Sequence, residues 1–142
     1  NKSTHFNQGF ATVEYLAASF LDMDWHTLKE VKEVDAEKFE NESMNRIGMI
    51  PEIVVRYKSP YFQHIFSGGY SAGYYSYIWA EVLDADAYES FKEKGLFNRE
   101  LANSFRKNIL ERGSIEDAMT MYVKFKGREP KIDALLKKRG LK

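Results

Sequence analysis

Three tyrosines and one histidine are the residues of this sequence whose types and spacing best suit chemistry. Tyr70, Tyr74 and Tyr77 follow one another at steps of four and three residues, and His64 precedes them across a glycine-rich stretch. If the helix that contains them begins near Ser71, the three phenols share one face. A phenol has a pKa of about 10, so at pH 7 it is a neutral donor that can stabilise a developing oxyanion. We therefore expect a site built from neutral hydrogen-bond donors.

The opposite side of the same helix offers an apolar face that is adequate for a core. That face consists of Tyr75, Ile78, Trp79, Val82 and Leu83. A buried tyrosine hydroxyl needs a hydrogen-bond partner, so core helices mostly use Leu or Phe. The phenol face is therefore not needed for the core and is available to bind a ligand. From the residues alone the plainer alternative stays open: the stripe is packing, and His64 is a core histidine with satisfied hydrogen bonds.

Other chemistries have weaker support in this stretch. It lacks the Gly-Lys-Ser/Thr ending of a phosphate-binding loop, and only Arg56 and Lys58 lie near it to line a groove for a nucleic-acid backbone. Glu81 is the single carboxylate in line with the tyrosines, which is weak support for acid-base catalysis. Gly68 and Gly69 allow positive φ angles or the close approach of a ligand to the backbone.

Composition excludes several classes of site. The chain has no cysteine, so it has neither disulfides nor thiolate nucleophiles and metal ligands. None of its histidines, His5, His26 and His64, is followed by Glu, and no two are close enough in sequence for a local metal site. There is no apolar run long enough to span a membrane, and we expect no signal peptide because the first residues lack a basic region followed by an apolar stretch. We expect a cytoplasmic protein without a membrane partner.

Charge is balanced overall, with 21 Lys+Arg against 21 Asp+Glu, but residues 124–142 hold eight Lys/Arg and only two acids. One interpretation is a patch that binds nucleic acid or an anionic membrane. The favoured interpretation is a solvated chain end in which Lys137, Lys138 and Arg139 complement the dipole of a last helix. The rest of the chain carries a net charge of −6, which repels phosphate. We expect no nucleic-acid partner.

Helical spacing and capping residues predict the elements that position these residues. A first helix is predicted over residues 7–25, and Asp35 is the predicted N-cap of a second that ends before Gly48. The first helix is expected to bury a wide apolar face, consisting of Phe10, Val13, Leu16, Ala17, Phe20 and Leu21. Residues 49–69 are expected to form a structured loop with a short extended piece at 53–55.

A long helix is predicted over residues 71–94, and Asn98 can cap the next. Ser114 with Asp117 predicts a further helix start, and Pro130 suits the first turn of a last helix. The residues of that last helix expected to point inward are Ile132, Leu135 and Leu136. The predicted fold class is all-α, a multi-helix array with one long structured loop.

The run HIFSGGYSAGYYSYIWAEVLDAD, residues 64–86, resembles the C-terminal region of the thimet oligopeptidase family of zinc metallopeptidases. Further stretches are similar to the same region, namely residues 8–18, 95–98, 125–130 and 133–136. The six-residue interval from His64 to Tyr70 is similar to the peptidyl-dipeptidase (dipeptidyl carboxypeptidase) branch, whereas oligopeptidase-type members usually have one residue fewer.

The resemblance implies a mostly helical enzyme with a deep channel that cleaves short unstructured peptides. It implies a zinc ion held by a His-Glu-x-x-His helix and a further glutamate, upstream of the matched region. None of these ligands is in the sequence. Residues 1–142 are therefore expected to be the C-terminal helical part of a catalytic domain, a single unit that is inactive alone and whose partner is the upstream part of the same polypeptide.

The resemblance also assigns roles to single residues. The positions that match residues which hydrogen-bond substrate and stabilise the tetrahedral intermediate are Tyr77, Tyr70 and His64. Tyr74 matches a further tyrosine of the set, and Gly68 and Gly69 match a flexible loop that closes over bound peptide. Arg56 is a candidate for binding the substrate's C-terminal carboxylate, since a guanidinium group suits it bidentately.

Two alternatives to a peptidyl-dipeptidase stay open. The first is an oligopeptidase of the same family that cuts short peptides internally. The second is a non-enzymatic helical module that binds a peptide through its aromatic face. The expected partners are short peptides in each case, and self-association of the chain through exposed apolar surface is a further expectation.

Overall fold

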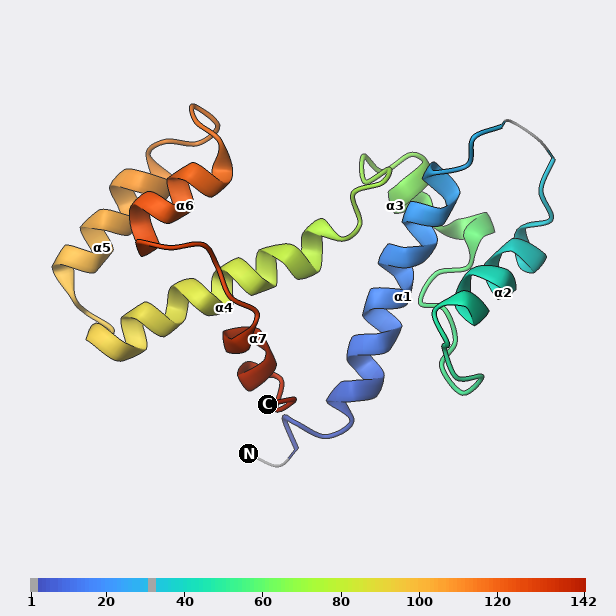
Figure 1. Ribbon diagram of the computed structural model, residues 1–142, viewed down its shortest axis with the longest axis horizontal. Coiled ribbons are helices and arrows are strands. Elements are labelled where there is room, and N and C mark those ends of the chain that lie inside the picture. Colours follow the sequence, from blue (N-terminus) through green and yellow to red (C-terminus); the bar gives the residue numbers. More distant parts are fainter. Residues whose placement is uncertain (1–2, 31–32) are drawn as a thin grey trace. The chain divides into compact units, whose positions relative to one another are not determined.

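Every regular element of the protein is a helix in the computed structural model, which describes residues 3–30 and 33–142 (Figure 1). No strand occurs within these described residues, and the predicted all-α class is confirmed. The chain divides into two compact units, Asn1–Ile78 and Trp79–Lys142. Each unit is described below by itself.

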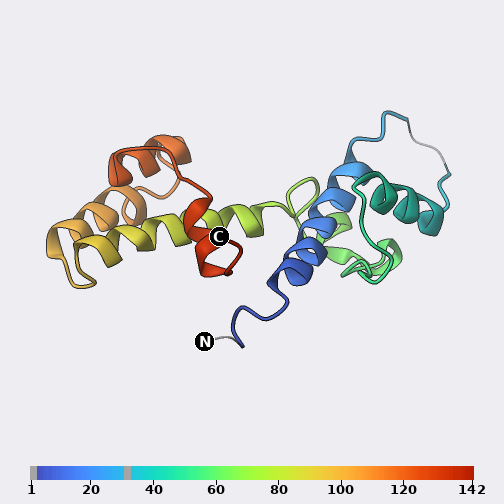
Figure 2. The same cartoon turned by 60° about the horizontal axis from the view of Figure 1, so that its bottom comes forward.

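The first unit is built on two helices that lie side by side, α1 (Gln8–His26) and α2 (Ala36–Arg46) (Figures 1 and 2). The predicted α1 is confirmed within one residue at each end, but its expected wide apolar face is wrong. Ala17 and Leu21 are buried, whereas Phe10, Val13 and Phe20 are exposed. Within this unit only one side of α1 is covered, so only a narrow stripe of it reaches the core.

Capping explains where α2 begins. The Asp35 side chain accepts a hydrogen bond from the Lys38 N–H at 3.0 Å, as predicted for an N-cap residue. The helix ends at Arg46, and Gly48 takes a φ of 69°, the left-handed conformation that glycine adopts most readily. The sequence prediction for α2 is confirmed.

The loop after α2 is more regular than predicted. It contains a 3₁₀ turn, η1 (Ser59–Tyr61), and a one-turn helix, α3 (Gln63–Phe66), and residues 53–55 form no extended element. Pro60 stands in the first turn of η1, where its missing N–H costs nothing. Phe62 and Ile65 are fully buried and fix both turns to the core.

The fourth helix, α4 (Ser76–Lys94), begins five residues later than the sequence predicts. Residues 71–75 form turns, and Ala72 has a φ of 51°. The physical reason lies on α1, where the carboxylate of Asp22 accepts hydrogen bonds from the N–H groups of Ala72 and Tyr74. These backbone donors are satisfied outside a helix, so the helix starts after them.

The second unit contains most of α4, followed by α5 (Arg99–Phe105), which continues into a π-helical turn, η2 (Arg106–Leu110). The remaining helices are α6 (Ala118–Lys126), which packs against η2, and α7 (Asp133–Lys138) (Figure 1). Asn98 caps α5 as predicted, since its side chain accepts from the Leu101 N–H at 2.9 Å.

Two predicted helix starts in this unit are wrong. Asp117, and not Ser114, is the N-cap of α6. The Asp117 carboxylate accepts hydrogen bonds from the Thr120 backbone N–H at 2.9 Å and from the Thr120 hydroxyl at 3.1 Å. Pro130 lies outside α7, which starts at Asp133. Ile132 therefore precedes the helix and is 58% exposed instead of pointing inward, whereas Leu135 is buried as predicted.

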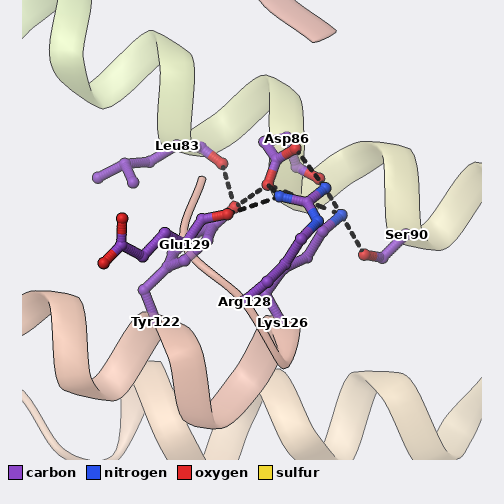
Figure 3. A network of polar contacts seen from close by, with 7 residues as sticks. All are labelled: Leu83, Asp86, Ser90, Tyr122, Lys126, Arg128 and Glu129. Atoms are coloured by element: carbon purple, nitrogen blue, oxygen red, sulfur yellow. Dashed lines mark hydrogen bonds and ion pairs between the residues drawn. The ribbon is translucent and has the colours of Figure 1, made fainter. Parts of the chain in front are cut away.

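Asp86 on α4 is the centre of a buried polar network in the second unit (Figure 3). Its two oxygens accept from the Arg128 guanidinium at 2.9 and 3.0 Å, and the Tyr122 hydroxyl donates to it at 2.7 Å. The Lys126 ammonium donates to the Asp86 carbonyl and to the Ser90 hydroxyl, both at 2.6 Å. Burial raises the pKa of Asp86, but the hydrogen bonds and the nearby cations outweigh it and hold the pKa below its ordinary value.

This network belongs to a wider pairing of the basic C-terminal segment. Six of its eight Lys/Arg side chains form ion pairs within the second unit, with Glu81, Asp84, Asp86, Glu116 and Asp133. Positive charge that is compensated in this way is not available to bind phosphate. The expectation of no nucleic-acid partner stays a prediction.

Candidate functional site

The predicted donor residues come together in the first unit, where the loop after α3 meets the start of α4. The Tyr70 ring stacks on the Tyr77 ring with centroids 4.8 Å apart, and Tyr74 meets Tyr77 edge-on at 5.1 Å. The His64 ring lies 6.4 Å from Tyr70 and 5.9 Å from Tyr74. The cluster forms although Tyr70 and Tyr74 precede α4 and do not lie on its face.

Glu81 does not belong to this cluster. Its carboxylate pairs with the guanidinium of Arg139 at 2.6 Å within the second unit. The predicted line of three phenols and one carboxylate is therefore replaced by a cluster of phenols and an imidazole.

Electrostatics favour the neutral form of Tyr77 and Tyr74, whose pKa values are raised. A hydrogen bond shared with the Tyr70 hydroxyl, together with partial desolvation, raises the pKa of Tyr77 to about 12. Burial raises the pKa of Tyr74, whose side chain is only 4% exposed and belongs to the hydrophobic core. Tyr77 thus has the chemistry of a neutral donor, whereas packing alone is a sufficient reason for a tyrosine ring at position 74.

A glycine turn sets the distance between His64 and Tyr70. The Tyr70 N–H donates to the His64 carbonyl at 3.0 Å, and the Gly68 N–H donates to the Gln63 carbonyl at 2.8 Å. A Cβ atom on Gly68 would lie 2.8 Å from the Cα of His64, and Gly69 has a φ of 83°. The turn can close only with glycine at position 68, and it folds Tyr70 back towards His64.

Arg56 is brought to the same cluster through its neighbour Tyr57. The guanidinium lies 5.7 Å from the centroid of the Tyr57 ring, and hydrogen bonding to Tyr57 raises the pKa of Arg56. The Tyr57 ring is in turn 5.0 Å from His64 and 6.4 Å from Tyr74. The Arg56 side chain is exposed and always charged, so it can meet an anionic group of a ligand.

Two aromatic residues of the site were not predicted. Tyr57 bridges Arg56 and His64, and Tyr15 on α1 places its ring 6.3 Å from that of Tyr74. Tyr15 lies in one of the stretches that resemble the metallopeptidase family, which was a usable signal. For Tyr57, adjacency to Arg56 was the only signal, because a loop has no periodicity that shows which side chains meet.

Four buried or partly buried hydrogen bonds hold the two ends of the segment that carries the site. Glu40 accepts from the Ser59 N–H at 2.5 Å, and the Trp25 indole donates to the Ser59 hydroxyl at 2.9 Å. Asp22 holds the other end, accepting from Ala72 N–H at 2.9 Å and Tyr74 N–H at 2.8 Å. Both anchoring carboxylates are buried, and neither was predicted as a functional residue.

The site residues do not form a metal centre. In residues 3–30 and 33–142 no group of three His, Cys, Asp or Glu side chains is placed to hold a metal ion. His26 lies beside Asp22 at 2.8 Å, and His64 lies among aromatic rings. This set of phenols and one imidazole among aromatic rings does not fit zinc.

The described residues thus bring together a cluster of neutral donors and contain no group of three metal ligands. The profile of peptidase family M3 matches residues 1–141, and the chain belongs to this family of metallopeptidases. The match confirms the resemblance noted in the sequence. The part of the chain that the structure describes has no helix long and apolar enough to cross a membrane.

Individual relatives share this region. The chain is 44% identical over 142 residues to a dipeptidyl carboxypeptidase of Salmonella typhimurium, a match that covers 99% of this chain and 21% of the relative. It is 58% identical over 81 residues to oligopeptidase A of the same organism, covering 57% of this chain and 12% of the relative. Saccharolysin of Saccharomyces cerevisiae is 35% identical over 143 residues, a match that covers 99% of this chain and 20% of the relative. The chain thus spans about a fifth of the length of the relatives that it matches along its whole length.

Proposed function

We propose that this chain supplies the substrate-binding and oxyanion-stabilising side chains of a zinc-dependent peptidyl-dipeptidase, which releases dipeptides from the C-terminus of short peptides. Zinc, held by residues outside these 142, would supply Lewis acidity. The partners of the chain are then the short peptide and the upstream part of the same polypeptide. A cytoplasmic location fits such substrates and is part of the proposal.

The observation that carries this proposal is the stacked pair of Tyr70 and Tyr77. With its pKa raised to about 12, the Tyr77 phenol keeps its proton at neutral pH and can donate it in a hydrogen bond to the oxyanion of the tetrahedral intermediate. Tyr70 and His64 lie beside it to bind the same region of the peptide. Such donors accelerate a reaction because they bind the charge that develops only in the transition state.

Release of dipeptides requires recognition of the substrate's C-terminal carboxylate. The exposed guanidinium of Arg56, held on the Tyr57 ring, is the group we assign to it. The name of the relatives matched along nearly the whole chain, dipeptidyl carboxypeptidase, supports this assignment. Gly68 and Gly69 form the turn that we expect to close over the bound peptide.

A second candidate function is internal cleavage of short peptides. It is favoured by the higher identity, 58%, to oligopeptidase A over an 81-residue region. An oligopeptidase needs no contact to a terminal carboxylate. The two candidates therefore differ in what they predict for Arg56 and for the products.

The test of the proposed function uses the full-length peptidase that contains this chain. Tyr77→Phe is expected to lower kcat by about 100-fold or more, with a much smaller change in KM, because the hydroxyl acts mainly in the transition state. Tyr88→Phe is the matched control, since Tyr88 is an exposed tyrosine elsewhere on α4. An unchanged kcat in Tyr77→Phe would refute the proposed role, and a protein without peptidase activity would favour the binding-module alternative.

Analysis of the products separates the two peptidase candidates. A peptide with a free C-terminus and its C-terminal amide are offered to the same enzyme. A peptidyl-dipeptidase releases dipeptides and loses activity on the amide, and Arg56→Lys weakens binding of the free peptide only. Equal cleavage of the two peptides at internal bonds would identify an oligopeptidase.

A further inference from the structure

Asp22 is a buried carboxylate that the proposed reaction does not use directly. It lies on α1 with 0% exposure, and each of its oxygens accepts a backbone hydrogen bond from the segment before α4. Burial of a carboxylate is unfavourable unless such bonds compensate for the lost water. The segment that Asp22 holds by these bonds therefore has to explain why a charge is buried here.

What Asp22 holds is the segment 71–75, which connects Tyr70 to Tyr77. The sequence of this segment favours a helix, yet Ala72 takes a left-handed φ of 51° that is strained for a residue with a Cβ atom. The N–H of Ala72 and the N–H of Tyr74 both point to Asp22. The conformation that lets the Tyr70 ring stack on Tyr77 thus depends on these two bonds.

His26 supports the carboxylate from its own helix, four residues along. Its Nδ1 atom lies 2.8 Å from Oδ1 of Asp22 and 2.8 Å from the Asp22 main-chain carbonyl. The His26 ring also contacts Phe66 of α3, with centroids 5.8 Å apart. The orientation of the Asp22 side chain is therefore fixed on one side by α1 and on the other by the segment that it holds.

We propose that Asp22 is the positioning residue of the donor site: it fixes segment 71–75 so that Tyr70 and Tyr77 reach their paired arrangement, and it controls turnover without touching the substrate. This inference rests on the proposed function of Tyr77. It assigns a role to a residue on α1, more than 40 positions before the donors in the sequence.

Asp86 offers a matched control, because it is a second buried carboxylate that is held by hydrogen bonds. Its partners Tyr122 and Arg128 belong to the second unit and not to the donor cluster. In the full-length enzyme we expect Asp22→Asn to lower kcat by about 10- to 100-fold with KM within about threefold, since small displacements of a positioned group have effects of this size. Asp86→Asn is expected to lower thermal stability to a similar extent or more, with kcat within about twofold.

A double-mutant cycle shows whether Asp22 acts through Tyr77. When Tyr77 is already Phe, Asp22→Asn is expected to lower kcat by less than about threefold, because the group that it positions has been removed. Multiplicative losses in the double variant would overturn the inference. So would a loss of kcat in Asp86→Asn as large as that in Asp22→Asn, since both effects would then be structural.

The cycle also separates the inference from the proposed function. If Tyr77→Phe alone leaves kcat unchanged, the proposed function fails, and the positioning role fails with it. If Tyr77→Phe lowers kcat and Asp22→Asn does not, only the positioning role is wrong. Should Asp22→Asn fail to fold, Asp22→Glu with Asp86→Glu as control makes the same comparison, because each moves a carboxylate by one methylene without removing it.

Discussion

The rings of Tyr70 and Tyr77 stack with their centroids 4.8 Å apart and their planes 27° from parallel, and hydrogen bonding to Tyr70 raises the pKa of Tyr77 to about 12. Tyr70 comes from the glycine turn and Tyr77 from the first turn of α4. The spacing of the two tyrosines in the sequence thus has an electrostatic consequence, the raised pKa of Tyr77. Its consequences can be measured one at a time.

The first prediction concerns the titration of Tyr77. Tyr70→Phe is expected to lower the pKa of Tyr77 from about 12 towards the ordinary value of about 10, because the hydrogen bond that favours the neutral phenol is lost. Tyrosinate absorbance followed against pH measures the shift, with Tyr88→Phe as control. A raised folded-state pKa also means that Tyr77 stabilises the fold fully below pH of about 10 and loses this contribution as pH rises to about 12. A Tyr77 pKa that is equal in both variants would contradict the pairing.

The second prediction concerns Gly68. Gly68→Ala brings a Cβ atom to within 2.8 Å of the His64 Cα, so His64 has to shift, and we expect kcat of the full-length enzyme to fall by about 10-fold or more. Gly48→Ala is the control. Gly48 follows α2 and has a φ of 69°, at which an alanine is strained. No atom lies within 4 Å of a Cβ placed there, so the substitution causes no clash. Loss of stability by about 1 kcal/mol with unchanged kcat is expected there.

The third prediction concerns the Asp86 network. Asp86→Asn removes the charge that Arg128 and Lys126 share, and we expect the free energy of unfolding to fall by about 2 to 3 kcal/mol. Asp84→Asn, on the same helix, breaks only the exposed pair with Lys138 and should change it by less than about 0.5 kcal/mol. Urea unfolding measures both, and equal effects would show that burial of Asp86 is unimportant.

The same network predicts a pH dependence. The pKa of Asp86 is lower in the folded than in the unfolded chain, so its contribution is fully present above the ordinary aspartate value of about 4. The contribution is lost as the pH falls below that value, through the lowered folded-state pKa. Stability of the Asp86→Asn variant should therefore decline less than that of the parent chain over this acidic range, which urea unfolding at several pH values can establish.

The fourth prediction concerns metal. The purified 142-residue chain is expected to bind zinc far below one equivalent and to leave short peptides uncut, because its described residues contain no group of three ligands. Metal analysis after dialysis and a peptide assay measure this. One tightly held zinc per chain would contradict the proposal that the metal ligands lie in another part of the polypeptide.

Local signals in the sequence predicted part of this fold well. Asp35 and Asn98 were recognised as N-caps because a cap acts over three residues, and the structure shows both hydrogen bonds. The start of α4 was misplaced because the competing acceptor, Asp22, is 50 residues away from Ala72. No periodicity within a segment contains information about such a partner.

The site shows the same division. The sequence singles out His64, Tyr70 and Tyr77 because their spacing is short and their chemistry is unusual for a core helix, and the structure brings their rings together. Tyr15 and Tyr57 approach the same cluster from α1 and from an irregular loop, so only the fold brings them together. The buried carboxylates that hold the loop, Asp22 and Glu40, could not be distinguished in the sequence from the solvated acids around them.

Replacement of Ala72 by glycine is expected to raise the stability of the fold and to lower turnover. An alanine in the left-handed conformation costs about 1 to 2 kcal/mol compared with glycine, which adopts it freely. Glycine would relieve this strain but would also let the segment between the two tyrosines move more freely. In a library that varies position 72, selection for heat resistance should enrich glycine and asparagine, whereas selection for turnover should retain the alanine.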